Sequence, residues 1–220
     1  MPGKSMYDEI LLEIKNLEKS FAAQAVIRDL SLTIRHGERV ALCAPSGAGK
    51  TTLIRILAGL EKADAGRVML KEQPPVTIFQ EPRLFPFMTV EENIYLPFKA
   101  QEKAIDPQVR RECLEWLEVC ELAAYKKHYP FQLSGGMKQK VSLVRALLGR
   151  PRFVLMDEPF QSIGSESKLG IIRHFLQTNP QVSLLFITHI REEVPLLAHR
   201  VVYFQQPCLS QALQMPAACY

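Results

Sequence analysis

The stretch Ala44-Pro45-Ser46-Gly47-Ala48-Gly49-Lys50-Thr51-Thr52 decides the fold. An apolar run at 40–43 precedes it, and apolar residues with helical spacing follow it at 53–60. Strand, small-residue turn, Gly-Lys-Thr and helix are the parts of a phosphate-binding loop, because small residues let backbone N–H groups converge on an anion at the helix start. Lys50 is then placed to reach the outer phosphates, and the hydroxyl of Thr51 to hold Mg²⁺. The sequence therefore predicts that residues 44–52 bind a phosphate-bearing nucleotide.

One position departs from the G-x-x-x-x-G-K-[ST] pattern, since Ala44 stands where the first glycine is expected. Should that position require a positive φ, the Cβ of Ala44 would cost on the order of 1 kcal/mol. The alternative for the whole stretch is an ordinary glycine turn that happens to precede Lys-Thr. The flanking strand and helix favour the phosphate-binding loop over this alternative.

The composition is that of an ordinary globular protein, with 220 residues, an apolar fraction of 47% and a charged fraction of 23%. The net charge of +4 is too small to indicate nucleic-acid binding, so we expect no such partner. No apolar stretch approaches the roughly 18–20 residues of a membrane span, and Lys4, Asp8 and Glu9 argue against a secretory signal. The five cysteines lack metal-ligand spacing and fit a reducing, cytoplasmic compartment.

Apolar runs and helical patterns alternate along the chain and predict a mostly parallel, doubly wound α/β sheet. Helical spacing from Asp106-Pro107 onward, with Cys113, Trp116 and Cys120 on one face, predicts an inserted lobe of helices. The two cysteines are then buried apolar thiols. We therefore expect a single domain at 1–220, with a nucleotide-binding core at 1–84 and 151–204, a helical lobe at 85–150 and a C-terminal tail at 205–220.

Four further motifs follow the phosphate-binding loop in order. Gln80 ends an apolar strand, Leu133-Ser134-Gly135-Gly136-Met137 opens a helix, Asp157-Glu158 follows the apolar run 153–156, and His189 follows another apolar run. In this order the chain resembles the ATP-binding subunits of ABC transporters, over residues 10–204. The resemblance implies a P-loop NTPase fold with an N-terminal antiparallel β part, ATP as the nucleotide, and a helical lobe that contains the Leu-Ser-Gly-Gly helix start.

Four polar residues stand at or just past strand ends, where the ligands of a parallel sheet gather: Gln80, Asp157, Glu158 and His189. We expect them to converge on the γ-phosphate held at Lys50. Asp157 would hold Mg²⁺ beside Thr51, and Glu158 would act as the general base on the attacking water. The resemblance implies that Gln80 contacts Mg²⁺ and this water, and that His189 contacts the γ-phosphate. The alternatives are a solvated strand end for Asp157-Glu158 and a histidine with only structural bonds at 189.

Two further predictions concern nucleotide contacts outside the loop. The resemblance implies that Phe21 stacks on adenine, and its alternative is an aromatic residue in the core of an edge strand. Ser134, Gly135 and Gly136 form a helix start suited to an anion. The resemblance implies that this helix start completes the ATP pocket of a second, head-to-tail subunit, in a homodimer or a heterodimer. A plain helix N-cap with a flexible turn is the alternative.

Short motifs also indicate the kind of transporter. Met137 and the stretch Phe79-Gln80-Glu81-Pro82-Arg83-Leu84 resemble importers of the nitrate, sulfonate and taurine group. The partners would then be integral membrane permease subunits and an extracytoplasmic solute-binding protein, with this chain peripheral on the inner face of the cell membrane. Gly164 stands where the family usually has Asp. This departure predicts retained hydrolysis with weaker coupling between the two ATP sites.

Two other functions stay open. The first is the same ATPase in an exporter or a lipid-extracting complex. The second is a non-transport, ATP-dependent switch, as in translation or DNA repair. The single phosphate-binding loop, the lack of a long coiled-coil pattern and the presence of Glu158 argue against the switch.

Overall fold

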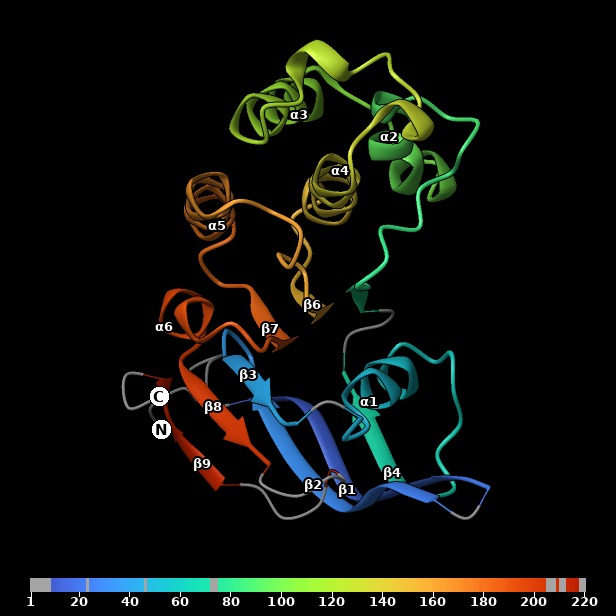
Figure 1. The fold of residues 1–220 in the computed structure, drawn as a ribbon, viewed down its shortest axis with the longest axis vertical. Coiled ribbons are helices and arrows are strands. Elements are labelled where there is room, and N and C mark those ends of the chain that lie inside the picture. Colours follow the sequence, from blue (N-terminus) through green and yellow to red (C-terminus); the bar gives the residue numbers. More distant parts are fainter. Residues whose placement is uncertain are drawn as a thin grey trace, which may run out of the picture. The chain divides into compact units, whose positions relative to one another are not determined.

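The computed structural model describes residues 9–22, 24–45, 47–71, 75–204, 209 and 213–217. It divides into two compact units, and Figure 1 labels most of their helices and strands. The core unit comprises Met1–Thr77, Arg152–Glu158 and Gln181–Tyr220, and the helical unit comprises Ile78–Pro151 and Pro159–Pro180.

The core unit is built on a six-stranded sheet with the strand order β5-β6-β7-β3-β8-β9. Strand β3 pairs in parallel with β7 and β8, and β6 pairs in parallel with β7. Every residue of β6 and β7 is buried, because parallel strands are covered on both faces, and this explains their unbroken apolar sequences. The strands are β3 (Arg39–Cys43), β5 (Val76–Ile78), β6 (Phe153–Asp157), β7 (Ser183–Ile187), β8 (Arg200–Tyr203) and β9 (Leu213–Pro216).

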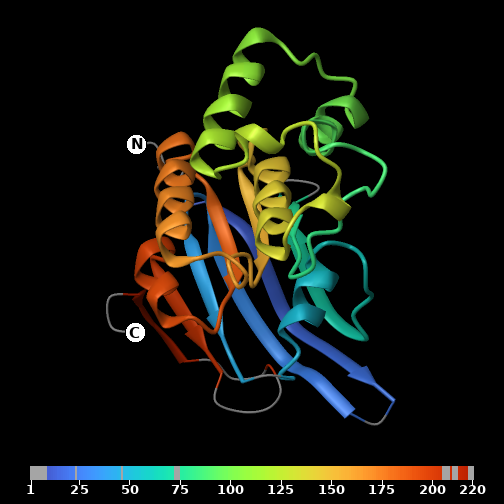
Figure 2. The ribbon, with the colours of Figure 1, turned by 45° about the horizontal axis from the view of Figure 1, so that its top comes forward.

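A second sheet in the core unit is antiparallel, with the order β2-β1-β4. Its strands are β1 (Ile10–Phe21), β2 (Gln24–Arg35) and β4 (Ala65–Leu70). Figure 2 shows β1 and β2 as two long neighbouring strands, paired from Ile10↔Arg35 to Phe21↔Gln24. The predicted α/β fold, with a mostly parallel sheet and an antiparallel N-terminal part, is confirmed.

Among the described residues, the helical segments of the core unit are α1 (Lys50–Leu57), the 3₁₀ turn η4 (Arg191–Glu193) and α6 (Val194–Leu197). Helix α1 packs on β6, and α6 packs on β3. The buried side of α1 consists of Leu53, Ile54, Ile56 and Leu57. Because α1 follows directly from the loop after β3, this packing fixes the N-terminus of α1 beside the end of β6.

The helical unit contains α2 (Val90–Ala100), α3 (Pro107–Val119), α4 (Gly135–Leu147) and α5 (Ser165–Thr178), with the 3₁₀ turns η2 (Ala123–Tyr125) and η3 (Pro130–Gln132). The predicted helix start at Asp106 is confirmed, because its carboxylate accepts hydrogen bonds from the N–H groups of Gln108 and Val109 at 2.8 and 2.9 Å. Helix α3 packs on α4 and α5, and α2 packs on α4. Cys113 and Cys120 are buried free thiols, as predicted.

The helical unit is larger than the predicted lobe at 85–150, because it begins at Ile78 and also includes α5. Helix α5 follows the core strand β6 in sequence, yet its apolar face is used by α3. The periodicity of α5 predicts an apolar face but does not identify the helix against which that face packs.

The predicted C-terminal tail is wrong for β9, which forms an antiparallel pair with β8. Leu209 is also buried and forms an isolated bridge with Ile27. A four-residue strand has too few residues for a periodic pattern, and its pairing groups come from the open edge of β8. Residues 205–208, 210–212 and 218–220 lie outside the described residues.

Candidate functional site

The loop between β3 and α1 has the geometry of an anion cradle, with Ser46 outside the described residues. Gly47 and Gly49 have φ values of 78° and 95°, which L side chains rarely adopt. A Cβ on Gly49 would lie 2.4 Å from the carbonyl oxygen of Val26 on β2, so only glycine fits there. Ala44 is not among the positive-φ residues, so its Cβ adds no left-handed strain to the loop.

The ammonium of Lys50 lies back over this loop. It donates hydrogen bonds to the carbonyl oxygens of Ala44 at 2.8 Å and Pro45 at 2.9 Å. Ala48 is fully buried and its N–H donates to the Pro45 carbonyl at 3.3 Å, which closes the turn. A cation is therefore held over the cradle, next to the start of α1, where an anion would replace the two carbonyl groups as its partner.

Thr51 and Asp157 join the two elements that meet at this point. The hydroxyl of Thr51, on α1, donates to Oδ2 of Asp157 at the end of β6 over 2.7 Å. Burial raises the pKa of Asp157, the hydrogen bond from Thr51 opposes this shift, and only 3% of the residue is exposed. A hydroxyl oxygen and a carboxylate in contact are hard oxygen ligands that suit Mg²⁺, and Thr52 lies half-buried next to them.

Glu158 and His189 meet beyond the ends of β6 and β7. The parallel register pairs Asp157 with Ile187, so the residues that follow each strand are brought together. Oε2 of Glu158 lies 3.2 Å from Nδ1 of His189, and their side chains are 18% and 56% exposed. Glu158 has a φ of 48°, which costs a non-glycine residue about 1–2 kcal/mol. Its N–H donates to the carbonyl of Ile187 at 3.0 Å, which holds this turn against β7.

Phe21 ends β1 and is 47% exposed, so the alternative of a buried core aromatic is wrong. The pairing Phe21↔Gln24 places it at the tip of the β1–β2 hairpin. Val26, two residues beyond Gln24, is the residue against which Gly49 packs. The exposed ring therefore belongs to the end of the hairpin that approaches the phosphate-binding loop.

Gln80 and the Ser134–Gly136 helix start belong to the helical unit. Nε2 of Gln80 donates to Oε1 of Gln161 over 2.9 Å. The hydroxyl of Ser134 caps α4 by accepting from the N–H of Met137 at 3.3 Å. A Cβ on Gly136 would lie 2.5 Å from the carbonyl oxygen of Ser162, whereas a Cβ on Gly135 would meet nothing within 4 Å. The residues that follow Glu158 in sequence thus contact both Gln80 and the start of α4.

Sequence reasoning missed three of the residues in these contacts: Gln161, Ser162 and Gln139. Nε2 of Gln139, which is buried in α4, donates to the carbonyl of Pro159 at 3.0 Å. Their positions have no spacing signal, because each bond joins a loop to a distant helix or strand end. The neighbouring Asp157-Glu158 pair and the departure at Gly164 pointed to this segment, but not to these contacts.

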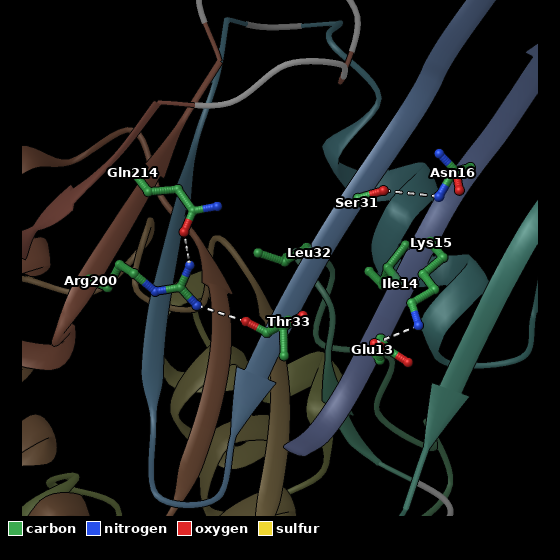
Figure 3. A pocket seen from close by; sticks show the side chains of 9 residues that line it. All are labelled: Glu13, Ile14, Lys15, Asn16, Ser31, Leu32, Thr33, Arg200 and Gln214. Carbon is green, nitrogen blue, oxygen red and sulfur yellow. Dashed lines mark hydrogen bonds and ion pairs between the residues drawn. The ribbon is translucent and has the colours of Figure 1, made fainter. Parts of the chain in front are cut away.

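A separate cavity of about 510 Å³ lies on the core unit between β1, β2, β8 and β9 (Figure 3). Its lining includes Arg200, which donates to the carbonyl of Thr33, the side chain of Gln214 and the carboxylate of Glu38. The predicted site residues are absent from this lining. The guanidinium of Arg200 already has three partners, and its bond to Thr33 joins the two sheets. We therefore propose no ligand for this cavity.

Within the described ranges, none of the helices combines the length and apolar character needed to cross a bilayer.

Sequence comparison relates this chain to known transport proteins. Residues 27–161 match the profile of a family described as ABC transporter. A spermidine/putrescine import ATP-binding protein of Chromobacterium violaceum is 37% identical over 96% of this chain and 61% of its own length. A sulfate/thiosulfate import ATP-binding protein of Photorhabdus laumondii is 37% identical over 91% of this chain and 59% of its own length. This chain thus spans about three-fifths of the length of these relatives.

Structural comparison agrees with the sequence. An ATP-binding cassette, solved as a dimer in a post-hydrolysis state bound to ADP and Pi, is similar with a TM-score of 0.81 and 26% identity, over 94% of this chain and 98% of that one. An ATP-binding subunit of an ABC transporter is similar with a TM-score of 0.83 and 25% identity, over 93% and 90% of the two chains.

Proposed function

This chain belongs to the ABC transporter family, among its ATP-binding subunits, and on that premise we propose that it binds ATP with Mg²⁺ and hydrolyses it to drive transport across a membrane. The main support is the hydrogen bond between Thr51 and Asp157 next to the contact between Glu158 and His189, at 2.7 and 3.2 Å. These pairs group a hydroxyl, two carboxylates and an imidazole, a set of side chains that supports a site for a phosphate and Mg²⁺ beside the loop.

The residues of the core unit have different roles in this proposal. Lys50 and the backbone N–H groups of the loop at 44–52, other than Pro45, which has none, bind the phosphates at the N-terminus of α1. Thr51 and Asp157 hold Mg²⁺, and because the hydroxyl hydrogen of Thr51 points to Asp157, the lone pairs of its oxygen are free for the cation. When bound, Mg²⁺ neutralises the charge that develops on the phosphate oxygens.

Glu158 is the proposed general base. It accepts a proton as the oxygen of water attacks the γ-phosphorus, and the bond from that phosphorus to the β–γ bridging oxygen breaks, which gives ADP and phosphate. His189, whose Nδ1 lies 3.2 Å from the Glu158 carboxylate, orients this carboxylate and contacts the γ-phosphate. Gln80 would contact Mg²⁺ and the attacking water, and its bond to Gln161 is then exchanged for these contacts.

We further propose that a second ATP-binding subunit completes each site, with ATP between Lys50 of one copy and Ser134–Gly136 of the other. The open space around Gly135 supports this, because a ligand can approach the helix start closely. Gly164 is the N-cap of α5 and has no side chain to reach a partner. We expect weak coupling between the two sites, which predicts a Hill coefficient near one for ATP; strong cooperativity in a homodimer would contradict it.

The proposed direction of transport is import, because both named relatives are import ATP-binding proteins. The partners are then permease subunits in the membrane and an extracytoplasmic solute-binding protein, with this chain on the cytoplasmic face. The narrower proposal, an importer of the nitrate, sulfonate and taurine group, rests on Phe79–Leu84 and Met137 alone. Purification of the complex from membranes tests this point. A permease that comes without a solute-binding protein would favour an exporter instead.

The catalytic proposal is tested with Glu158→Gln, which keeps the size of the side chain and removes its basicity. We expect ATP affinity to persist and turnover to fall by about 10²–10⁴-fold, the usual contribution of a general base. Glu192→Gln is the matched control, because Glu192 is exposed on the turn after His189. Unchanged turnover in Glu158→Gln refutes Glu158 as base. A wild-type protein without ATPase activity, even with its permease in lipid, overturns the enzyme proposal.

A further inference from the structure

Lys19, near the end of β1, is a buried cation held by two carboxylates. Its side chain is 10% exposed, and its ammonium lies 3.0 Å from Glu61 and 3.1 Å from Asp64. Both carboxylates come from the connection between α1 and β4, so they reach β1 from a different part of the core unit. Their hydrogen bonds, with that of Glu61 the stronger influence, raise the pKa of Lys19. The ammonium therefore stays charged at neutral pH.

Asp64 also fixes the backbone next to this lysine. Its second carboxylate oxygen accepts from the N–H of Ser20 at 2.7 Å, and its own N–H donates to the carbonyl of Glu18 at 2.9 Å. Asp64 thus binds Ser20, the residue before Phe21, through its side chain, and Glu18 through its main chain. These bonds fix the backbone of β1 immediately before Phe21.

The ammonium of Lys19 lies 5.0 Å from the centroid of the Phe21 ring. This distance is within the range of a cation–π contact, which is attractive because the ring face is electron-rich. One face of the ring is therefore occupied by the cation, while 47% of the residue remains exposed. An exposed aromatic side chain with its ring held from one side is suited to stacking on a planar ligand with the other side.

The neighbouring phosphate-binding loop indicates which ligand that is. Gly49 approaches the carbonyl of Val26 so closely that a Cβ would lie 2.4 Å from it. Along β2, Val26 is next to Ala25, which pairs with Ser20, and Phe21 pairs with Gln24. A nucleotide whose phosphates occupy the loop would have its base on the side of this hairpin tip.

We propose that Lys19, clamped by Asp64 and Glu61, is a positioning residue that holds Phe21 as the platform for the nucleobase. This inference rests on the proposed nucleotide site. In this proposal Lys19 affects binding of the base and not of the phosphates. The reason is that its ammonium is paired with two carboxylates and faces the Phe21 ring. A clamp that only joins β1 to the α1–β4 connection is the competing explanation.

The test compares a ligand with a base to one without. Binding of ADP and of inorganic diphosphate, each with Mg²⁺, is measured by calorimetry for wild type, Phe21→Ala, Lys19→Met and Lys19→Arg. Lys15→Met is the matched control, since Lys15 lies on the same strand, pairs with Glu13 at 2.9 Å and has a 59% exposed side chain. If Lys19→Met does not fold, Asp64→Asn is used in its place. This variant removes one carboxylate from Lys19, while the asparagine amide oxygen still accepts the hydrogen bond from the Ser20 N–H.

We expect Lys19→Met to weaken ADP binding about two- to fivefold, the fold-change that corresponds to a cation–π contact, with diphosphate binding unchanged. Lys19→Arg should restore ADP affinity, Lys15→Met should match wild type, and Lys19→Met should have no further effect in a Phe21→Ala background.

Equal losses for ADP and diphosphate would identify a structural clamp and overturn the inference, as would wild-type ADP affinity in Lys19→Met. A Phe21→Ala variant that keeps full ADP affinity would overturn the base platform itself, and a wild type that binds neither ligand would overturn the proposed nucleotide site.

Discussion

The two glycines at the start of α4, Gly135 and Gly136, differ in how much space surrounds them, and replacing each by alanine tests this difference. A Cβ on Gly135 would meet nothing within 4 Å, whereas a Cβ on Gly136 would lie 2.5 Å from the carbonyl oxygen of Ser162. Neither glycine is among the residues with a positive φ, so alanine fits the backbone at both positions. We expect Gly135→Ala to preserve or raise stability and Gly136→Ala to lower it.

The magnitude follows from the difference between the variants. Replacing glycine by alanine in a helix gains up to about 1 kcal/mol at each position, so this gain largely cancels in the comparison. The contact with Ser162 must open by about 0.8–1.1 Å to reach a normal C···O distance. Overpacking of this kind typically costs about 1–3 kcal/mol. Gly136→Ala should therefore be less stable than Gly135→Ala by about 1–3 kcal/mol, or about 2–4 °C in Tm for each kcal/mol in a chain of this size.

The assay uses the single tryptophan of the chain, Trp116, which is buried in α3 of the helical unit. Its fluorescence during urea or thermal unfolding reports on the unit that contains both glycines. Gly149→Ala on the same unit is the control, because its Cβ would make only an ordinary contact, 3.9 Å from Phe98. Equal stability of the two variants, or a greater loss in Gly135→Ala, would refute the close packing of Gly136 on Ser162. ATPase activity should fall in Gly135→Ala despite its stability, because the proposed partner's ATP approaches there.

Three further outcomes are expected. Asp157→Asn should stabilise the unliganded protein at neutral pH, because burial raises the pKa of Asp157 above its unfolded value. The contribution of Asp157 to stability is therefore present at acid pH and is lost as the pH rises through the folded pKa. Thermal melts should show this advantage disappearing below about pH 4, and an advantage that persists there would contradict the assignment. Gly49→Ala should abolish nucleotide binding, measured by calorimetry, because alanine at a φ of 95° would also meet the Val26 carbonyl at 2.4 Å; wild-type affinity would refute the cradle geometry. Arg200→Met should lower the free energy of unfolding by about 1–3 kcal/mol, since it leaves the half-buried Glu38 carboxylate without its guanidinium partner; an unchanged urea midpoint would show that Arg200 does not join the sheets.

Much of the site could be predicted from the sequence because its parts are local. The phosphate-binding loop needs small residues and a following helix, and residues 44–52 provide both. The buried strand β6 reads as an apolar run that ends in Asp157-Glu158, so the acidic pair could be placed at a strand end. The cap of α3 at Asp106 was predictable for the same reason, since one side chain bonds to N–H groups two and three residues away.

The contacts between distant segments could not be predicted in this way. Only the backbone geometry shows that Ala44 avoids a positive φ, because a dihedral angle depends on the surrounding fold and not on residue type alone. The bond between Gln80 and Gln161 joins residues with no common pattern. The tail prediction failed at β9 because four residues contain no periodic signal and the strand forms only on the edge of β8.

The sequence by itself determined the alternation of strands and helices up to β8, the phosphate-binding loop, the acidic pair and the family resemblance. These depend on hydrophobic periodicity and on backbone preferences, which act over a few neighbouring residues. Tertiary structure alone decided that Gly49 packs on Val26, that Gly136 packs on Ser162, and that Glu61 and Asp64 hold Lys19. Each of these contacts joins segments brought together only when the core closes, and no local preference encodes which partner a side chain or a glycine will meet.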